Sequence, residues 1–374
     1  MNNSILLYDD DPPLERILGR LHSVFDFRVG IYSPLKRLRK LHPEDSIFYY
    51  HPDPVYEQCI CRQKDLFSWR EVHGHDNDQP AASDLSSVFA RVHYASDLKL
   101  MHSLDQVADT IIGDLSAWFK TDKLRSVGPG SGDYQCIGSE KDLHIHNRAQ
   151  VLPGVIFNTS AGPIIIDREA SISPHSYLQG PLYIGKGARL DNVRIGGACS
   201  VGKQVRLGGE IENSIIQDYS NKHHDGFLGH SLIGRWVNMG AMATTSDLKN
   251  NYGQVHLQIP SQNRPRTSAD AANWALQETS TNTIKFGSVI ADCVKIAIGT
   301  MINTGTVIDA GCNVFGQMPA KYMAPLSWGR NGVPYDKERF KQDARTIFER
   351  RDHRASSAFD LLVDRLTAEQ GLFS

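Results

Sequence analysis

Aliphatic residues recur at every sixth position through two long stretches of the chain. One run begins at Ile284 and continues at intervals of six: Ile290, Ile296, Ile302, Ile308 and Val314. A second run keeps the same interval, with one five-residue step after Leu190: Ile166, Ile172, Leu178, Ile184, Leu190, Ile195, Val201 and Leu207. Small or acidic residues often follow the aliphatic one, as in "IGKG", "IGGA" and "IDAG". A period this regular predicts a repeat architecture.

Neither ordinary secondary-structure period explains this pattern. A surface helix needs apolar residues every 3.6 positions, and its glycines would each cost about 1 kcal/mol. A simple strand alternates at two, and glycine every few residues would break it. The pattern instead predicts short strands joined by tight turns, with each aliphatic side chain pointing inward onto its equivalent one coil away. Such coils lie about 4.8 Å apart and are joined by parallel strand pairing.

The rest of the chain predicts three further regions. Residues 1–125 lack the six-residue period and combine two predicted strands, "SILLYDD" and "SIFYYHP", with a short helix and an amphipathic helix, "LDQVADTIIGDLSAWFK". We therefore expect a small α/β domain there. Residues 126–149 form a linker, and residues 150–318 form the coil, with a polar insertion at 252–283 that we expect to be a loop with a short helix. Residues 319–374 form a tail with docking helices.

Composition argues against several classes of partner. Lys and Arg number 40 against 42 Asp and Glu, with a pI near 6.7. Nucleic-acid and membrane-surface binders carry a basic excess, so we expect neither partner. Six cysteines are scattered singly apart from Cys59 and Cys61, which fits no disulfide framework or zinc pattern. The N-terminus has no signal-peptide pattern, and a soluble cytoplasmic protein is expected.

The six-residue period fails at "SNKHHDGFLGH", residues 220–230. Exposed loop histidines usually have no chemical role, but this excursion interrupts an otherwise regular coil, where an inserted loop needs a reason. It brings a candidate general base, His224, beside two candidate orienting groups, Lys222 and Asp225. One coil later "WVNMGAMATTSDLKNNYG" departs from the period again and supplies Asn238, Asn251 and other polar groups.

The stretch "HDGFLGHSLIGRWVNMGAMATTSDLKNNYG" resembles the acetyltransferase half of the bifunctional N-acetylglucosamine-1-phosphate uridyltransferase/glucosamine-1-phosphate acetyltransferase family. That family has a catalytic histidine followed by "xxYLG", "VNIGAGT" and "NYDG". His224 falls on the catalytic histidine, Phe227 on a sugar-phosphate-contacting tyrosine and Asn238 on the acceptor-site asparagine. Asn251 and Tyr252 match "NY" after a four-residue insertion. Residues 150–330 resemble most closely a divergent bacterial branch with a short, atypical nucleotidyltransferase-like N-terminal part.

The resemblance implies a left-handed parallel β-helix of hexapeptide repeats that works as a homotrimer. It also implies acetyl-CoA as cosubstrate and an amino-sugar phosphate as acceptor. Histidine ordinarily titrates near neutrality, so His224 would take the proton of the attacking amine. Lys222 would pair with the sugar phosphate, and Arg206 is a weaker candidate for the same role. Acetyl-CoA lies between two prisms in this fold class, which makes Ala241 and Thr300 candidate cofactor contacts.

Two departures from the family pattern affect the acceptor and the N-terminal region. Phe227 replaces the tyrosine and cannot donate a hydrogen bond, and Met242 stands where the family has glycine. The N-terminus lacks the "LxxGxGTRM" loop that holds nucleotide phosphates, so Mg²⁺ is expected only if this region is an active nucleotidyltransferase. Asp9, Asp10 and Arg28 are read as a turn and a surface charge rather than as remnants of a site. The histidines of "HGHD" and "HIH" lack a third ligand, and we assign no metal.

Three functions remain open from the sequence. The first is acetyl-CoA-dependent N-acetylation of an amino-sugar phosphate in sugar-nucleotide synthesis. The second adds nucleotidyl transfer to the sugar 1-phosphate by the N-terminal region. The third is a non-catalytic trimeric β-helix scaffold, because such coils stack without any chemistry.

Overall fold

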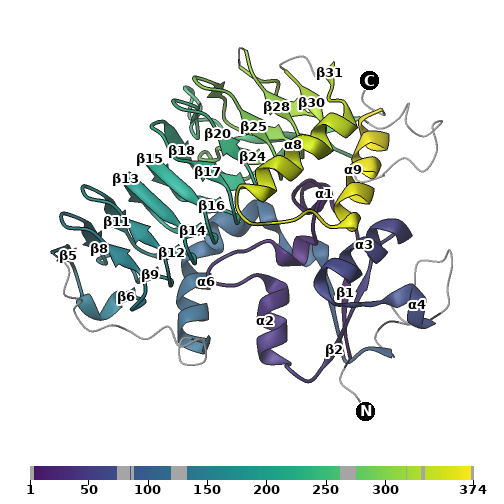
Figure 1. The fold of residues 1–374 in the computed structure, drawn as a ribbon, viewed down its shortest axis with the longest axis horizontal. Helices are drawn as coiled ribbons and strands as arrows, with labels where there is room; N and C mark the ends of the chain where they lie inside the picture. The colour runs from purple at the N-terminus through teal and green to yellow at the C-terminus, as the bar shows by residue number, and fades with distance from the viewer. Residues whose placement is uncertain are drawn as a thin grey trace.

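The computed structural model describes residues 4–73, 85, 88–118, 133–261, 275–316, 318–329 and 333–371. A long coil of parallel strands runs through the molecule, and the N-terminal α/β region and two C-terminal helices pack against it (Figure 1). The expected linker lies partly outside the described residues, as do most of "HGHD" and the centre of the insertion. The described part of the linker already belongs to the coil, because residues 135–137 and 143–145 pair with coil strands. The coil also continues past its expected end at residue 318, as far as Trp328. None of the described helices is long and apolar enough to cross a membrane.

The N-terminal region contains a four-stranded parallel sheet in the order β3-β2-β1-β4. The predicted strands and helices are present here. The strands are β1 (Ser4–Tyr8), β2 (Ser46–Tyr50), β3 (Phe67–Ser68) and β4 (Arg91–Tyr94). The helices are α1 (Pro13–Gly19), α2 (Pro34–Leu41), α3 (Pro54–Lys64), α4 (Trp69–His73) and α6 (Ser103–Trp118). Pro34 and Pro54 occupy the first turns of α2 and α3, and the Ser33 and Asp53 side chains cap these two helices.

The predicted coil is present as stacked strands in three hydrogen-bonded sheets, which we call its first, second and third faces; the strands pair parallel except β30 with β31. The first face contains β5 (Gln135–Ile137), β7 (Gln150–Val151), β8 (Ile156–Asn158), β10 (Ser171–Ile172), β11 (Tyr177–Gln179), β13 (Arg189–Gly196), β15 (Arg206–Glu212), β17 (Asn221–Lys222), β18 (Phe227–Gly229), β20 (Asn238–Met239), β25 (Lys295–Ile296), β28 (Asn313–Val314), β30 (Ser327–Trp328) and β31 (Val333–Pro334). The second contains β6 (Leu143–Ile145), β9 (Ile164–Ile166), β12 (Leu182–Ile184), β14 (Cys199–Val201), β16 (Ile215–Ile216), β19 (Leu232–Ile233), β24 (Ser288–Ile290), β27 (Thr306–Ile308) and β29 (Tyr322–Met323). The third contains β21 (Thr244–Thr245) and β26 (Met301–Ile302).

The six-residue period becomes a column of side chains inside the coil. On the second face, strand register places aliphatic residues and one methionine directly on one another: Ile166, Ile184, Val201, Ile216, Ile233, Ile290, Ile308 and Met323. Each of these side chains is buried. Burial of one such side chain contributes roughly 1.5–3 kcal/mol, so the stack supplies much of the coil's stability.

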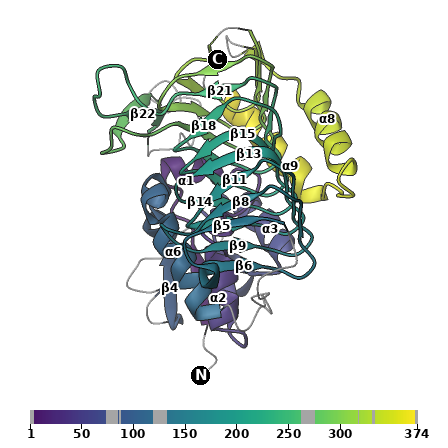
Figure 2. The ribbon, with the colours of Figure 1, turned by 90° about the vertical axis from the view of Figure 1, so that its left-hand side faces the viewer.

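The outer side of the second face is covered, whereas an ordinary surface strand would face water. Its outward residues join a core with the N-terminal helices and the C-terminal tail: Ile165, Tyr183, Ile215, Leu232, Val289, Val307 and Tyr322. Helix α6 packs against β12 and β14, along one side of the coil (Figure 2). The coil and the N-terminal region therefore share one continuous hydrophobic core.

The insertion and the tail complete the fold. Strand β19 pairs with β24 across the insertion, so the coil resumes in register after it. Where a loop with a short helix was expected, the described residues form an antiparallel hairpin of β22 (His256–Pro260) and β23 (Leu276–Ser280). The helical tail is confirmed as α8 (Lys337–Glu349) and α9 (Ser357–Gln370).

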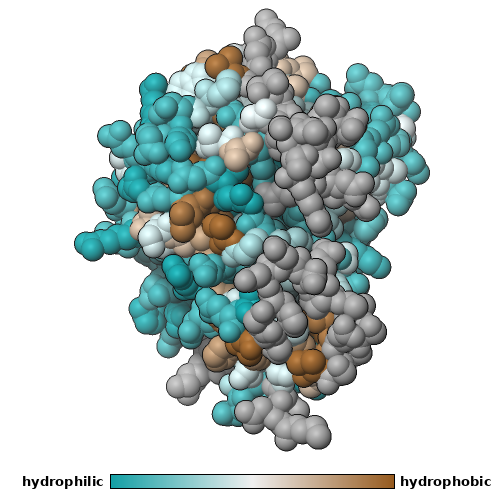
Figure 3. Space-filling view, turned by 90° about the vertical axis from the view of Figure 1, so that its right-hand side faces the viewer, coloured by the Kyte–Doolittle hydropathy of each residue, from teal (hydrophilic) through white to brown (hydrophobic). Residues whose placement is uncertain are grey.

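The face seen in Figure 3 is mostly hydrophilic, with apolar side chains in small separate groups.

Candidate functional site

A groove of about 440 Å³ lies on the coil surface beside the broken repeat. We call it the coil groove. Its floor is a column of residues from four successive strands in register: Tyr177, Arg194, Glu210 and Phe227. Its edge is formed by turn residues that include His175, Asn192 and Asp225. The groove thus follows the coil axis and ends at the excursion that the sequence singled out.

His224 stands in this excursion with an exposed side chain. Its ring lies edge-on to the ring of His223, with centroids 5.0 Å apart. His223 in turn places Nδ1 3.3 Å from a carboxylate oxygen of Asp191 on the neighbouring coil. An exposed imidazole can exchange protons with solvent and with a bound amine, as a general base must. The carboxylate of this group, from Asp191, therefore pairs with His223. The sequence had instead suggested Asp225 as an orienting group for His224.

Lys222 is not placed as the resemblance implied. Its side chain is 4% exposed, and Nζ donates hydrogen bonds to Gly208 O at 3.1 Å and His224 O at 2.5 Å. Burial lowers the pKa of this ammonium group to about 8, although Asp225 opposes the shift. The ammonium would have to leave two backbone acceptors to reach a sugar phosphate. Its geometry instead fixes the backbone of the loop that presents His224.

Phe227 and Asn238 occupy different columns of the first face. The Phe227 ring lines the coil groove, and its position requires Gly229, because a Cβ there would lie 2.3 Å from the ring. Asn238 is exposed and accepts a hydrogen bond from Asn221 Nδ2 at 2.7 Å. Arg206 pairs in register with Asn221, so Arg206 and Asn238 flank that residue in one stack. The structure therefore brings these two predicted residues together but separates their column from that of Phe227.

The remaining predicted residues lie near the third face or in the following turn. Ala241 O accepts from Gly299 N at 2.8 Å, so Ala241 and Thr300 belong to adjacent coils. Thr300 is buried, its hydroxyl donates to Ala297 O, and its carbonyl accepts from Thr244 N at 3.0 Å, so the structure does not present either group to a cofactor. Asn251 Oδ1 accepts from Gly253 N at 3.0 Å within an exposed turn. Tyr252 is 68% exposed in the same turn.

Sequence reasoning gave no role to His230, the last residue of the excursion. His230 Nδ1 lies 2.6 Å from an Asp247 carboxylate oxygen, and its Nε2 lies 3.2 Å from Asn213 Nδ2. Glu212 completes a group of ligand-type atoms that lie within 4.8 Å of one another. Both ring nitrogens already have partners, so the arrangement is a satisfied structural pair. His230 and Asp247 are 17 residues apart, which is one turn of the coil. This periodicity is the sequence signal that could have predicted their pairing.

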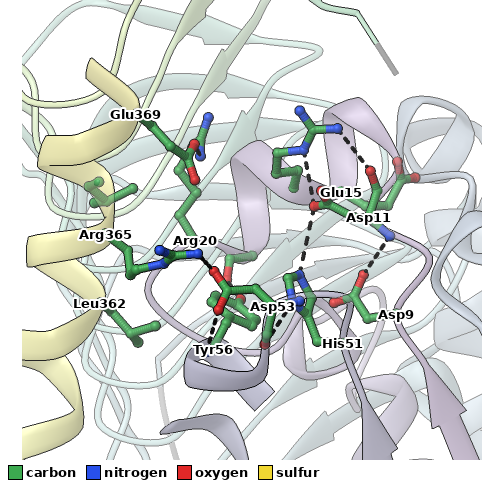
Figure 4. A pocket seen from close by; sticks show the side chains of 13 residues that line it. Asp9, Asp11, Glu15, Arg20, His51, Asp53, Tyr56, Leu362, Arg365 and Glu369 are labelled. Atoms are coloured by element: carbon green, nitrogen blue, oxygen red, sulfur yellow. Dashed lines mark hydrogen bonds and ion pairs between the residues drawn. The ribbon is translucent and has the colours of Figure 1, made fainter. Parts of the chain in front are cut away.

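A polar pocket lies where β1 and β2 end, beneath α9 (Figure 4). Its cavity is only about 20 Å³. Asp9 is buried and accepts a hydrogen bond from the Tyr49 hydroxyl at 2.8 Å, and burial raises the pKa of its carboxyl. Burial also raises the pKa of Glu15 to about 7, although a hydrogen bond from Leu100 N opposes the shift. Asp9, which the sequence favoured as part of a turn, is therefore buried beside the end of β1, whereas Asp10 is exposed.

Comparison with known proteins gives a partial resemblance. No family model matches the sequence. The chain is 31% identical over 152 residues to "Bifunctional protein GlmU" of Acaryochloris marina, covering 41% of this chain and 26% of that protein. It is 29% identical over 118 residues to the protein of the same name from Rippkaea orientalis, covering 22% of this chain and 26% of that one. The chain thus spans about a quarter of the length of the curated relatives that it matches.

Two solved structures show only distant likeness. One is a perosamine N-acetyltransferase mutant from Caulobacter crescentus in complex with CoA and GDP-perosamine, at 12% identity and a TM-score of 0.19, covering 89% of this chain and 96% of that one. The other is a mutant of AntD, an N-acyltransferase from Bacillus cereus, in complex with dTDP and coenzyme A, at 10% identity and a TM-score of 0.16, covering 58% and 91%. At these TM-scores the two structures give no information about the function of this chain.

Proposed function

We propose that this protein is an acetyl-CoA-dependent N-acetyltransferase that acts on an amino-sugar phosphate, with His224 as general base. The observation that carries the proposal is the coincidence of three features at one place. The repeat breaks there, the motif of the acetyltransferase family matches there, and His224, with an exposed imidazole, directly precedes Asp225, which lines the coil groove. The partial identity to GlmU supports the same family.

The chemistry follows from the groups present. His224 removes a proton from the ammonium of the bound sugar, and the freed amine attacks the thioester carbonyl of acetyl-CoA. The C–S bond then breaks, CoA leaves as a thiolate that takes up the second proton lost by the nitrogen, and the amide remains on the sugar. Asn238 and Arg206, which share one stack, would bind the acceptor. Arg206, rather than the buried Lys222, is then the candidate partner for the sugar phosphate.

The proposal includes a left-handed coil and a homotrimer. Support for an additional chain comes from an exposed apolar group next to Ala241 and Thr300. Met242 is 61% exposed, Ile298 77% and Met301 61%, on neighbouring coils. Exposed apolar side chains gathered at one place are typical of an interface. Met242 also adopts a left-handed conformation with φ of 61°, as expected where the family has glycine.

The polar pocket of the N-terminal region does not favour nucleotidyl transfer at that place. The polar pocket at the ends of β1 and β2 has about 20 Å³ of space, whereas one water needs roughly 10–15 Å³. Arg365 and Glu369 of α9 close this pocket through ion pairs with Asp53 and Arg20 (Figure 4).

The decisive experiment follows thiol release from acetyl-CoA with glucosamine 1-phosphate and a panel of related amino sugars. His224→Ala should reduce the rate by about 10² or more, the usual contribution of a general base. The matched control is His223→Ala, which removes the adjacent imidazole and should cost less than about tenfold. Wild-type protein that is inert with every acceptor, or a fully active His224→Ala variant, would overturn the proposal.

A further inference from the structure

A second cleft, of about 690 Å³, lies between three parts of the chain that are distant in sequence. We call it the basic cleft. One wall comes from the N-terminal region, including α2 and the end of α3, and another from a corner of the coil at Lys203, Tyr219 and Trp236. The third comes from the segment that joins α8 to α9, which crosses the space between the other two (Figure 1). Its volume falls in the range of small-molecule sites.

The charge of this lining is strongly one-sided. Eight Lys and Arg side chains line the cleft against three Asp. All three carboxylates already have partners in the cleft wall. Asp26 binds Lys64 Nζ at 2.5 Å and Arg235 at 2.6 Å, Asp218 lies 3.3 Å from Arg28, and Asp292 lies 2.5 Å from His22 Nδ1. The protein as a whole has a formal net charge of −2, so the cationic excess is local.

Several cationic groups of the cleft have no carboxylate partner among the described residues. Each wall contributes one such cation: Arg62, Lys203 or Arg354. Within the described residues none of the three forms an ion pair. Arg62 and Arg354 are exposed at the rim, and Lys203 Nζ lies 5.0 Å from the centroid of the Tyr219 ring. Like charges converge here without mutual neutralisation, which costs free energy unless an anion binds.

Buried polar atoms in the same walls also lack partners. Within the described residues, the Nε atoms of Arg28 and Arg235 and the Nε2 atom of His22 are buried without a hydrogen bond. His22 is 3% exposed, and its Nδ1 is engaged by Asp292. Unsatisfied buried groups are rare in folded proteins, because each costs roughly 1–3 kcal/mol. The arginine Nε atoms suit phosphate oxygens, and the remaining lone pair of a neutral His22 suits a ligand hydroxyl.

The coil corner in this cleft carries two large aromatic residues. At each turn of the coil the corner residue has positive φ, a conformation for which glycine is best suited. Gly187 and Gly311 occupy it in two turns, and Glu169, Gln204 and Cys293 occupy it in others. Here the positions are taken by Tyr219 at φ of 66° and Trp236 at φ of 59°, with stacked rings 4.2 Å apart. A bulky residue in this region costs of order 1–2 kcal/mol. Large rigid side chains are retained at the cleft despite that cost.

We propose that the basic cleft binds a hydroxyl-bearing organic polyphosphate, a ligand with a di- or triphosphate group. The site is separate from the coil groove and from the polar pocket beneath α9, and it is complete within one chain. The three walls meet on the polyphosphate, whose charge offsets the cationic excess. Binding therefore ties the N-terminal region, the coil and the tail together.

The test is calorimetric titration of the full chain with ATP in the absence of divalent cations, using ATP as the probe. The variant R62Q/K203Q/R354Q removes one cation from each wall, all outside the hydrophobic core. It should weaken ATP binding by about tenfold or more. The control K141Q/R168Q/K285Q makes the same change in net charge at exposed positions outside the cleft and should change the affinity by less than twofold.

Two results would overturn the proposal. One is wild-type protein that fails to bind ATP at millimolar concentration and low salt; the other is equal weakening by the two triple variants, which would make the attraction non-specific. A titration with inorganic triphosphate shows whether the polyphosphate group alone accounts for the affinity for ATP. Binding several-fold weaker than that of ATP supports a contribution from the hydroxyl-bearing part, and equal binding assigns recognition to the polyphosphate group, overturning the role given to His22.

Discussion

The coil groove and the basic cleft use the same coil in different ways. The groove is made of residues from consecutive turns of the repeat, so its floor is a column such as Arg194, Glu210 and Phe227 in register. The cleft joins residues far apart in the chain, for example Asp26 and Arg235, which are 209 positions apart. The groove is open along its length, whereas the cleft is enclosed by three walls.

This difference in construction goes with a difference in electrostatics. In the groove, Arg194 and Glu210 pair at 2.6 Å with side chains that are 65% and 36% exposed. In the cleft, Asp26 and Arg235 pair at the same distance with side chains about one fifth exposed. Burial alone would raise the pKa of Asp26, but Arg235 and Lys64 outweigh it and hold that pKa well below its usual range. Charges are therefore structural in the cleft and largely solvated in the groove.

Replacing one carboxylate in each region should separate the two most clearly. Asp26→Asn leaves Lys64 and Arg235 facing each other without their shared anion. We expect a loss of about 3 kcal/mol of unfolding free energy, near the range for breaking buried pairs. Glu210→Gln is the matched control and should cost at most about 1 kcal/mol, as for exposed pairs. Denaturant-induced unfolding measures both, and equal losses would show that the two regions do not differ in this way.

A pH series should reveal the titration of a buried carboxyl in the N-terminal region. The pKa of Glu15 is raised from 4.5 in the unfolded chain to about 7 in the folded one, mainly by burial. A carboxyl with a raised pKa adds stability below pH 4.5, and that contribution is lost as the pH rises through 7. The shift corresponds to roughly 3 kcal/mol at most.

Glu15→Gln removes this titration and keeps an acceptor for Leu100 N. We expect wild type and variant to be about equally stable at pH 5, and the variant to be about 1–3 kcal/mol more stable at pH 8. Asp9 contributes in the same direction in both proteins, so only the difference between them reports on Glu15. Parallel stability curves from pH 5 to 8 would contradict the assignment.

The sequence predicted those parts of the molecule in which one local rule repeats. The inward column of Ile184, Val201 and their equivalents follows directly from the period of six, and α6 follows from its apolar face. The hairpin in the insertion was not predicted, because β22 has only one short alternation, at Leu257 and Ile259, and its partner β23 is mostly polar. The covered outer side of the second face was also missed, since residues such as Tyr183 and Val307 are buried by distant segments.

For the candidate sites too, the sequence predicted the local motif but not the contacts made between distant segments. The motif located the excursion and His224, but it could not show that Lys222 turns inward to two carbonyl groups. Arg28 was read as a surface charge, yet the fold places it 3.3 Å from Asp218 of the coil. The basic cleft has no signature in the sequence, because its walls meet only after the N-terminal region and the tail pack on the coil.

We propose that acetyl transfer at the coil groove needs another copy of the chain, whereas the basic cleft is complete within one chain. The double variant Ile298→Asp/Met301→Asp places charges in the exposed apolar group without touching the core. Sedimentation velocity would first establish the oligomer of the wild type and its dissociation in the variant. Acetyl transfer and ATP binding would then be measured on both proteins. We expect the dissociated variant to lose acetyl transfer and to keep its ATP affinity within about twofold. Acetyl transfer by a monomer, or loss of ATP binding on dissociation, would contradict it.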